Sequence, residues 1–141
     1  MATTTATITL SSSDITDNAL SISNTSTLHT AGTDTGITEF TGIARVKTST
    51  GSNTLLLDFG LTGGVAQDVT ADKSAKVYIK NINDRGDGTK YVDILIKTRE
   101  IGRLYGGDWM FIPYSGGTGE DIEYTASDTT ETTLEYGVFY E

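Results

Sequence analysis

The sequence predicts an all-β protein, a single-domain β-sandwich or jelly-roll-like barrel with an extended polar N-terminal arm. Composition is the first reason: 16 glycines accompany one proline, and β-branched threonine, which suits pleated strands, recurs throughout. Helix-forming residues are rarely spaced three or four apart on one face. Runs of strand length return about every 8–15 residues with turn residues between them, a spacing typical of sandwiches and barrels.

Chain length and charge limit the kinds of partner that we expect. The 141 residues suit one domain, and the absence of cysteine excludes disulfides and thiolate metal sites. A net charge of -9 repels phosphate groups and anionic lipid, so we expect neither a nucleic-acid nor a membrane partner. The start MATTTATITL lacks the features of a signal peptide, which predicts a protein made in the cytoplasm.

Residues 1–36 differ from the rest because they are rich in Ser, Thr and Asp and contain no aromatic residue. The run Thr5–Leu10 is expected to form a strand with Ala6, Ile8 and Leu10 on one face, and Leu20 and Ile22 mark a second strand. Two interpretations remain open. The segment forms weak edge strands joined by loops, or it is an arm that becomes ordered against a neighbouring subunit, because it buries too little surface alone.

The remaining domain, residues 37–141, is expected to hold seven strands, and a loop is expected at 60–72. The strands are Phe40–Lys47, Thr54–Phe59, Ala75–Ile82, Thr89–Lys97, Trp109–Tyr114, Asp121–Thr125 and Thr133–Tyr140. The strand Phe40–Lys47 is expected to lie in the core. The turn NDRGDG between Ala75–Ile82 and Thr89–Lys97 predicts that these two strands pair as a hairpin.

Residue alternation predicts which side chains of these strands point inward. Val92, Ile94 and Ile96 share one face of their strand, and the opposite face is mixed. In the last strand the inward set is Leu134, Tyr136, Val138 and Tyr140. Pro113 cannot donate to a ladder, so its end of the strand is expected at an edge.

No set of residues with a catalytic or metal-binding pattern stands out. His29 is the only histidine and has no partner for general-base or metal chemistry. The run NINDRGDG at 81–88 fails the calcium-loop pattern in both registers and is expected to be a turn. The acidic residues that invite a glycosidase interpretation are expected on the solvent face: Asp108, Glu120, Asp121, Glu123 and Glu135. We therefore predict no enzyme, no cofactor and no metal site.

Aromatic residues cluster in the last third of the chain, where they have two interpretations. They form the core or a subunit interface, or they provide a platform on which sugars stack: Tyr105, Trp109, Tyr114, Tyr124 and Tyr136. For a protein interface we single out Tyr105, Trp109, Phe111 and Tyr114, which lie beside Gly-rich turns.

A family resemblance rests on four features of the chain. The initiator Met precedes a Thr/Ser-rich start, and the acidic, Cys-free domain contains VYIKNINDRGDGTKYVDILI, then IGRLYGGDWMFIPYSG, then an aromatic C-terminal strand. Over about residues 75–141 the chain resembles small structural proteins of tailed bacteriophages, particularly those of cyanobacterial and marine phages. The resemblance implies a non-enzymatic virion component, commonly trimeric or otherwise symmetric, and it carries over no catalytic residue.

We therefore expect a capsid decoration (cement) protein on the exterior of a phage head, made in the host cytoplasm. Its expected partners are the major capsid protein and further copies of itself, with a trimer favoured. Two alternatives remain. One is a tail, neck or fibre component of the same kind of particle, and the other is a carbohydrate-binding module that recognises host glycans.

Overall fold

The protein is all-β in the computed structural model, which describes residues 3–15, 19–29, 34, 36–48, 53–57, 74–86, 88–114, 120–127 and 132–140. No helix occurs within these ranges. The strands are β1 (Thr5–Ser12), β2 (Leu20–Thr27), β3 (Glu39–Phe40), β4 (Ala44–Thr48), β5 (Thr54–Leu57), β6 (Ser74–Asn81), β7 (Tyr91–Ile96), β8 (Arg99–Tyr105), β9 (Trp109–Pro113), β10 (Ile122–Ala126) and β11 (Thr132–Tyr140).

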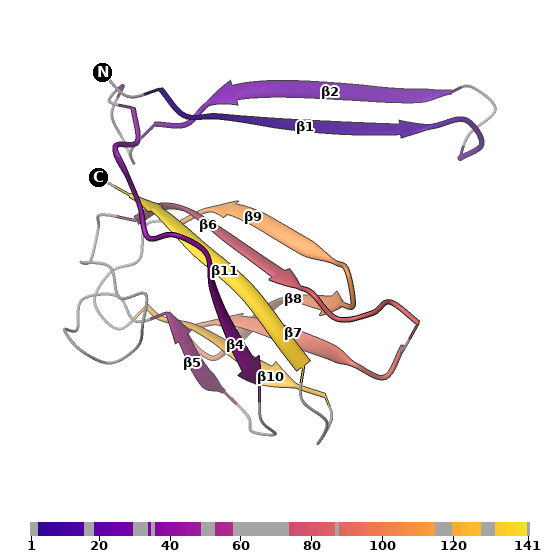
Figure 1. The fold of residues 1–141 in the computed structure, drawn as a ribbon, viewed down its shortest axis with the longest axis vertical. Helices are drawn as coiled ribbons and strands as arrows, with labels where there is room; N and C mark the ends of the chain where they lie inside the picture. Colours follow the sequence, from indigo (N-terminus) through magenta and orange to yellow (C-terminus); the bar gives the residue numbers. More distant parts are fainter. Residues whose placement is uncertain are drawn as a thin grey trace.

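The strands form three antiparallel sheets (Figure 1). Strands β1 and β2 pair only with each other. A four-stranded sheet has the order β5-β10-β7-β8, and a five-stranded sheet has the order β3-β11-β6-β9, with β4 also paired to β11. The long β11 is central to the five-stranded sheet, because it pairs with β6 on one side and with β3 and β4 on the other.

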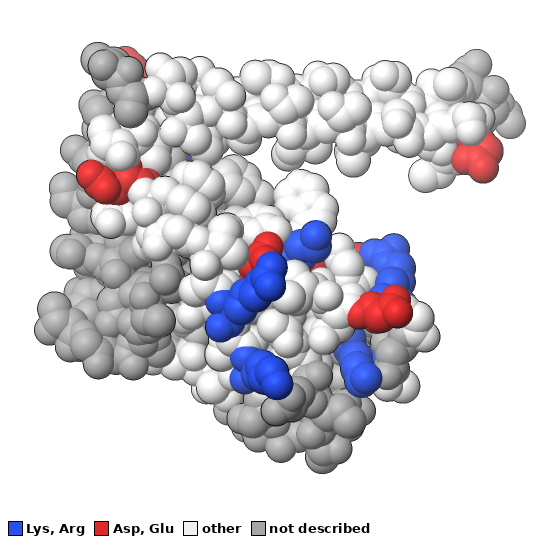
Figure 2. All heavy atoms as spheres, viewed as in Figure 1, with Lys and Arg blue, Asp and Glu red and all other residues white. Residues whose placement is uncertain are grey.

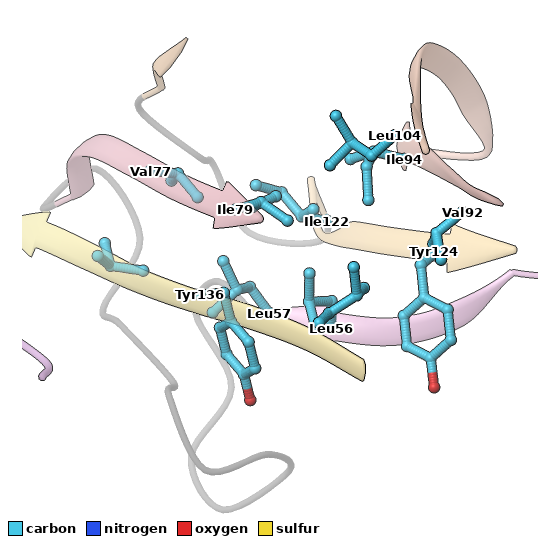
Figure 3. Packing of buried hydrophobic residues seen from close by; sticks show 12 residues of the cluster. Leu56, Leu57, Val77, Ile79, Val92, Ile94, Leu104, Ile122, Tyr124 and Tyr136 are labelled. Atoms are coloured by element: carbon cyan, nitrogen blue, oxygen red, sulfur yellow. The ribbon is translucent and has the colours of Figure 1, made fainter. Parts of the chain in front are cut away.

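One hydrophobic core joins the two larger sheets, which together we call the body (Figure 3). Its buried members come from both sheets: Leu56, Leu57, Val77, Ile79, Val92, Ile94, Leu104, Ile122, Tyr124, Leu134, Tyr136 and Val138. Alternation along the strands sends these side chains to the same side, as the sequence predicts for β7 and β11. Burying this apolar surface is the main source of stability for such a body.

The predicted hairpin between 75–82 and 89–97 is wrong, because β6 and β7 belong to different sheets. Strand β6 pairs with β11 and β9, and β7 pairs with β10 and β8. The chain leaves β6 through the buried Asn81, whose side-chain amide donates to the carbonyl oxygen of Leu104 in the other sheet at 3.0 Å. The glycine- and aspartate-rich segment that follows is therefore a crossing between sheets.

The tight hairpin of the body is formed by β7 and β8, around Lys97 and Thr98. Both residues have positive φ, 50° and 66°, as the two central residues of a type I′ turn require. Neither residue type is usual there, so the sequence contains no turn signal at this position. The turn is supported from β10, because the backbone amide of Thr98 donates to the Glu123 carboxylate at 3.1 Å.

The predicted core strand Phe40–Lys47 is wrong as well, because the segment lies at an edge of the five-stranded sheet and is broken into β3 and β4. Gly42 has φ +85° at the break, and the Thr41 hydroxyl accepts a hydrogen bond from the backbone amide of Val138 at 2.9 Å. A side chain thus replaces a backbone partner of β11, as at a bulge. Phe59 and the predicted loop at 60–72 lie outside the described residues.

Strands appear at both places predicted within residues 1–36. Neither joins an edge of the larger sheets, since each pairs along its whole length with the other. We call this two-stranded unit the N-terminal hairpin. In Figure 1 it lies apart from the body and projects beyond it.

Candidate docking surface

The N-terminal hairpin has two chemically different faces. The register pairs Thr5 with Thr27 and Ser11 with Ser21, and one face consists of Ser and Thr alone. Its hydroxyls bond across the strands, since the side-chain oxygens of Thr7 and Thr25 are 2.8 Å apart. The opposite face is the apolar face of the hairpin: Ala6, Ile8, Leu10, Leu20 and Ile22, with Ser12, Asn24 and Ser26.

Much of this apolar face is open to solvent. Ile8, Leu10 and Ile22 are 43%, 53% and 49% exposed. Strands β1 and β2 contain no charged residue, and Figure 2 shows the hairpin as a white bar with an acidic side chain near its tip. Asp14 follows the end of β1 by two residues and accepts a hydrogen bond from the Ser12 hydroxyl at 2.9 Å. Because two-stranded hairpins are marginal alone, an exposed apolar face indicates a surface that binds something.

A small apolar cluster attaches the base of the hairpin to the body. Leu28 and Ile37 are buried, and Ala6, Phe111 and Phe139 pack against them. The backbone amide of Leu28 donates to the Thr4 carbonyl at 2.8 Å. Ala6 belongs to the apolar face, so that face begins against the body and continues outward from it.

The outer face of the five-stranded sheet combines aromatic and basic side chains. We call it the aromatic–basic face. Its aromatic members are Phe40, Tyr78, Trp109, Phe111 and Phe139, and its basic members are Arg45, Lys47, Lys76 and Lys80. Glu135 is the acidic residue described on this face, although the whole chain carries a charge of -9. Figure 2 shows Lys and Arg side chains in blue over the body.

Three of the aromatics, Phe40, Phe111 and Phe139, gather near the base of the hairpin. Phe40 stacks on Phe139 with ring centroids 4.4 Å apart, and Phe111 meets Phe139 edge-on at 5.8 Å. Gly137 makes room for this arrangement, because a Cβ there would lie 2.8 Å from the Phe40 ring. Phe40 and Trp109 remain 40% and 52% exposed.

Three of the charged groups, Arg45, Glu135 and Lys80, lie in one row across the sheet. Register places Arg45 opposite Glu135, Glu135 opposite Lys80, and Lys80 opposite Trp109. The Arg45 guanidinium donates to one Glu135 oxygen at 2.8 Å, and the Tyr78 hydroxyl donates to the other at 3.3 Å. Burial, followed by the nearby Glu135 carboxylate, raises the pKa of Tyr78.

The four residues that the sequence singled out for a protein interface do not form one patch. Trp109 and Phe111 share the outer face of β9, where Phe111 joins the cluster at the hairpin base and Trp109 lies opposite Lys80. Tyr105 lies in the other sheet, at the end of β8. Tyr114 packs against the core, and its hydroxyl donates to the Glu120 carbonyl. Sequence reasoning missed Phe40, Phe139 and the cations on the same face, because strand order decides which residues become neighbours.

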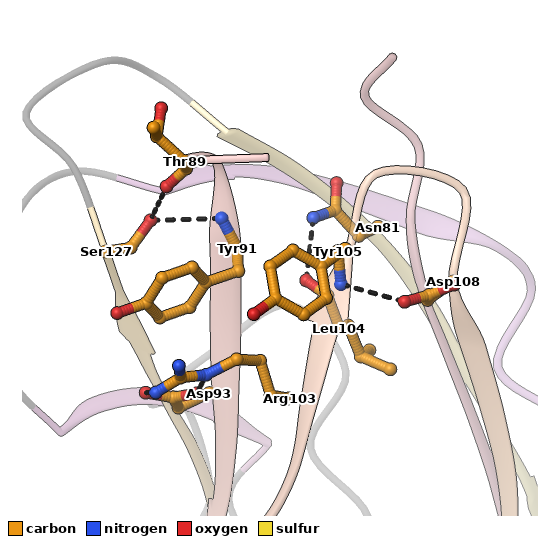
Figure 4. A network of polar contacts seen from close by, with 9 residues as sticks. All are labelled: Asn81, Thr89, Tyr91, Asp93, Arg103, Leu104, Tyr105, Asp108 and Ser127. Atoms are coloured by element: carbon orange, nitrogen blue, oxygen red, sulfur yellow. Dashed lines mark hydrogen bonds and ion pairs between the residues drawn. The ribbon is translucent and has the colours of Figure 1, made fainter. Parts of the chain in front are cut away.

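Tyr105 belongs to a second group of side chains, on the outer face of the four-stranded sheet (Figure 4). Its ring meets the Tyr91 ring at 5.6 Å, and the Arg103 guanidinium lies 3.8 Å from the centre of Tyr91. Asp93 holds that guanidinium through two hydrogen bonds, at 2.6 and 3.1 Å. The sugar platform predicted from sequence is thus divided, because Tyr105 and Trp109 lie on different sheets and Tyr124 and Tyr136 are buried in the core.

The acidic residues considered for catalysis have structural partners. Asp108 pairs with Arg85 and accepts from the Tyr105 backbone amide, Glu123 accepts from Thr98, and Glu135 from Arg45. No group of three or more His, Asp or Glu residues is placed to hold a metal ion within the ranges given above. His29 is exposed and bridges to Gly36. No helix among the residues placed by the structure is long and apolar enough to cross a membrane.

Comparisons with known proteins identify no relative. Models of known protein families give no match to the chain, and neither do curated protein sequences.

Proposed function

We propose that this chain is a non-enzymatic structural protein of a tailed-phage virion, a decoration protein on the exterior of the head. In this proposal the body is a β-sandwich, and the N-terminal hairpin is the arm by which each copy holds a neighbour. The protein joins neighbouring major capsid subunits and strengthens the shell. The resemblance of residues 75–141 to small phage structural proteins is the reason for proposing a phage virion as the assembly that contains this chain.

The observation that carries the proposal is the apolar face of the hairpin. It presents Ile8, Leu10 and Ile22 to solvent on two strands without a charge. A surface of this kind is costly to leave in water and is typical of protein–protein contacts. The side chains that invite a catalytic interpretation are instead held in ion pairs and backbone hydrogen bonds.

Reinforcement of the shell follows from binding equilibria. A protein that binds the assembled lattice, and binds free subunits poorly, stabilises the lattice in proportion to its occupancy. On the body, Phe111 supports this docking from the cluster at the hairpin base, and Trp109 supports it from its place opposite Lys80. Tyr105 would act from the other sheet, whereas Tyr114 is occupied in packing against the core.

The test is the location and copy number of the chain in particles. Purified protein added to heads that lack it should sediment with them, in hundreds of copies per head. Labelled protein should then lie on the outer surface of the head. Tens of copies at the tail or neck would instead identify a tail, neck or fibre component, and no sedimentation with any particle would reject a virion role.

A second candidate is glycan binding, and the tyrosine pair on the four-stranded sheet favours it. Tyr105 is 39% exposed beside Tyr91, and Arg103 and Asp93 offer polar groups next to the rings. Aromatic rings beside such groups are suited to sugars. A glycan array should then show binding that Tyr105→Ala removes and Trp109→Ala retains. An array without signal rejects this candidate.

A further inference from the structure

We propose that the N-terminal hairpin of one copy binds the aromatic–basic face of a second copy of the same chain. This inference rests on the proposed function only in treating the hairpin as a docking element. It adds the identity of the neighbour that the hairpin holds, and it assigns a role to the outer face of the five-stranded sheet.

Size and apolar character match between the two surfaces. At roughly 3.3 Å per residue, the eight-residue strands of the hairpin span about 26 Å and the nine-residue β11 spans about 30 Å. The hairpin brings Ile8, Leu10 and Ile22, and the sheet offers the exposed parts of Phe40 and Trp109. Face-to-face packing of two β surfaces buries both sets of side chains at once.

Within one copy, the base of the hairpin already contacts the aromatic end of the sheet, and this contact indicates which surfaces pack together between copies. Ala6, the first residue of the apolar face, already joins Phe111 and Phe139 in the cluster around Leu28 and Ile37. Beyond Ala6 the hairpin leaves its own body, as Figure 1 shows. Ile8, Leu10 and Ile22 on the hairpin, and Phe40 and Trp109 on the sheet, are each 40–53% exposed within one copy, and a neighbouring copy supplies the missing half of each surface.

Charge favours a second copy over an unrelated acidic or basic partner. The strands of the hairpin are neutral, so they approach a chain of charge -9 with little repulsion. Its tip carries Asp14. The aromatic–basic face carries Arg45, Lys47 and Lys80 away from the Phe40–Phe139 pair, whereas Lys76 lies beside Phe139. A hairpin that runs along this face from the aromatic end brings an acidic tip to the basic rows. Such complementarity fixes register and partner choice.

Because the two surfaces differ, the contact is heterologous, and copies that repeat it form a closed ring when the rotation allows. A contact made by one hairpin is smaller than the roughly 800 Å² per partner of a standard interface. Closing the ring compensates for the small area of each contact, since each copy then takes part in two contacts. A ring also presents several copies to a symmetric lattice, where weak attachments reinforce one another.

The full-length protein, without any heads, tests the proposal by analytical ultracentrifugation. We expect a mass that is a small whole multiple of 15.0 kDa. The double variant Ile8→Thr/Leu10→Thr should weaken assembly about 100-fold or more, because each change removes the burial of one large apolar side chain. The matched control is Thr7→Ala/Thr9→Ala on the hydroxyl face, which should leave the mass unchanged.

A charge exchange distinguishes this interface from others. Asp14→Lys and Lys80→Glu should each weaken assembly about tenfold, and an equimolar mixture of the two variants should assemble better than either alone. Circular dichroism and melting temperature check that each variant folds. A wild-type protein that stays monomeric at 100-fold the concentration used for head binding overturns the proposal, as does an oligomer that neither set of variants affects.

Head binding is scored separately, so the two proposals can fail independently. If the protein coats heads as a monomer, the virion role stands and the proposed contact between copies is rejected. If the protein forms a ring that binds no particle, the contact between copies stands and the virion role is rejected.

Discussion

At the scale of single residues, Asn81 shows how one polar side chain connects the two large sheets. It is fully buried, and its amide donates to Leu104 while its side-chain oxygen accepts from the Asn83 backbone at 3.1 Å and from the Asn83 side chain at 2.6 Å. Its backbone also bonds to Asp108 and Gly107 (Figure 4 shows the bond to Leu104). A buried polar group with every partner in place helps to specify one arrangement of the sheets.

Replacing this residue should therefore be costly. Asn81→Ala leaves the Leu104 carbonyl and the Asn83 groups without their partner, and we expect a loss of about 2–3 kcal/mol in the free energy of unfolding. Urea denaturation measures it. Asn24→Ala, at an exposed position of the hairpin, is the control and should change the value by less than about 0.5 kcal/mol. Equal effects of the two substitutions would show that the bridge between sheets contributes little.

Gly106 is the second residue on which the crossing depends. A Cβ at this position would lie 2.4 Å from the carbonyl oxygen of Asp84, so the backbone of the crossing segment fits only against glycine. Gly106→Ala should destabilise the protein by about 2 kcal/mol or more, since backbone must move to admit the methyl group. Gly88 has open space around its Cβ position, and Gly88→Ala should be tolerated. Similar melting temperatures for the two variants would contradict this account.

At the scale of elements, alternation predicted most strands and their inward faces. Alternation predicted two inward sets: Val92, Ile94 and Ile96 in β7, and Leu134, Tyr136, Val138 and Tyr140 in β11. All of these are buried in the core except Ile96 and Tyr140, which are partly buried against it. These predictions succeeded because a strand has a period of two, which is local information. Pairing is not local, and that is why the hairpin between β6 and β7 was predicted where the chain crosses between sheets.

The candidate docking surface was only partly predictable for the same reason. The apolar periodicity of residues 6–10 is visible in the sequence, and so is the bulk of Trp109 and Phe111. The aromatic–basic face is assembled from β3, β4, β6, β9 and β11. These strands span a hundred residues of chain, and nothing in their local patterns says that they are neighbours.

A substitution in the turn between β7 and β8 should raise the stability of the protein. Thr98 is β-branched and holds φ 66°, a conformation that costs most residues about 1 kcal/mol and glycine almost nothing. Thr98→Gly should raise the free energy of unfolding by about 0.5–1 kcal/mol, since the backbone bond to Glu123 is kept. Thr7→Gly, placed within a strand, should lower it. A loss of stability in Thr98→Gly would show that the threonine side chain contributes more than its strain costs.

At the scale of the whole molecule, the two surfaces assigned to docking differ from the chain as a whole, whose net charge is -9. The strands of the hairpin are neutral, and among the described residues the aromatic–basic face carries four cations and the Glu135 carboxylate. A charge of -9 keeps copies apart at random orientations, and the two complementary surfaces favour one orientation. This arrangement suits a protein that must remain dispersed until it meets its place in an ordered shell.

The stability of the whole molecule should fall in alkaline solution, because several tyrosines of the body resist ionisation when folded. Burial, then Glu120 and Asp121, raises the pKa of Tyr114 to about 12, and burial also raises the pKa of Tyr78 and Tyr124. In the unfolded chain these phenols ionise near the ordinary value of about 10. Between pH 10 and 12 the unfolded state therefore loses protons that the folded state keeps, and stability declines as pH rises.

Melting temperatures measured from pH 8 to 12 should stay level up to about pH 10 and then fall. In Tyr114→Phe the melting temperature at pH 8 should be lower, because the hydrogen bond to the Glu120 carbonyl is lost. Its decline above pH 10 should be shallower, since one phenol with a raised pKa is gone. The slope of melting temperature against pH above pH 10 is the decisive measurement, because a change in packing alone would lower the melting temperature equally at every pH. A variant curve parallel to the wild-type curve would show that Tyr114 ionises equally easily in both states.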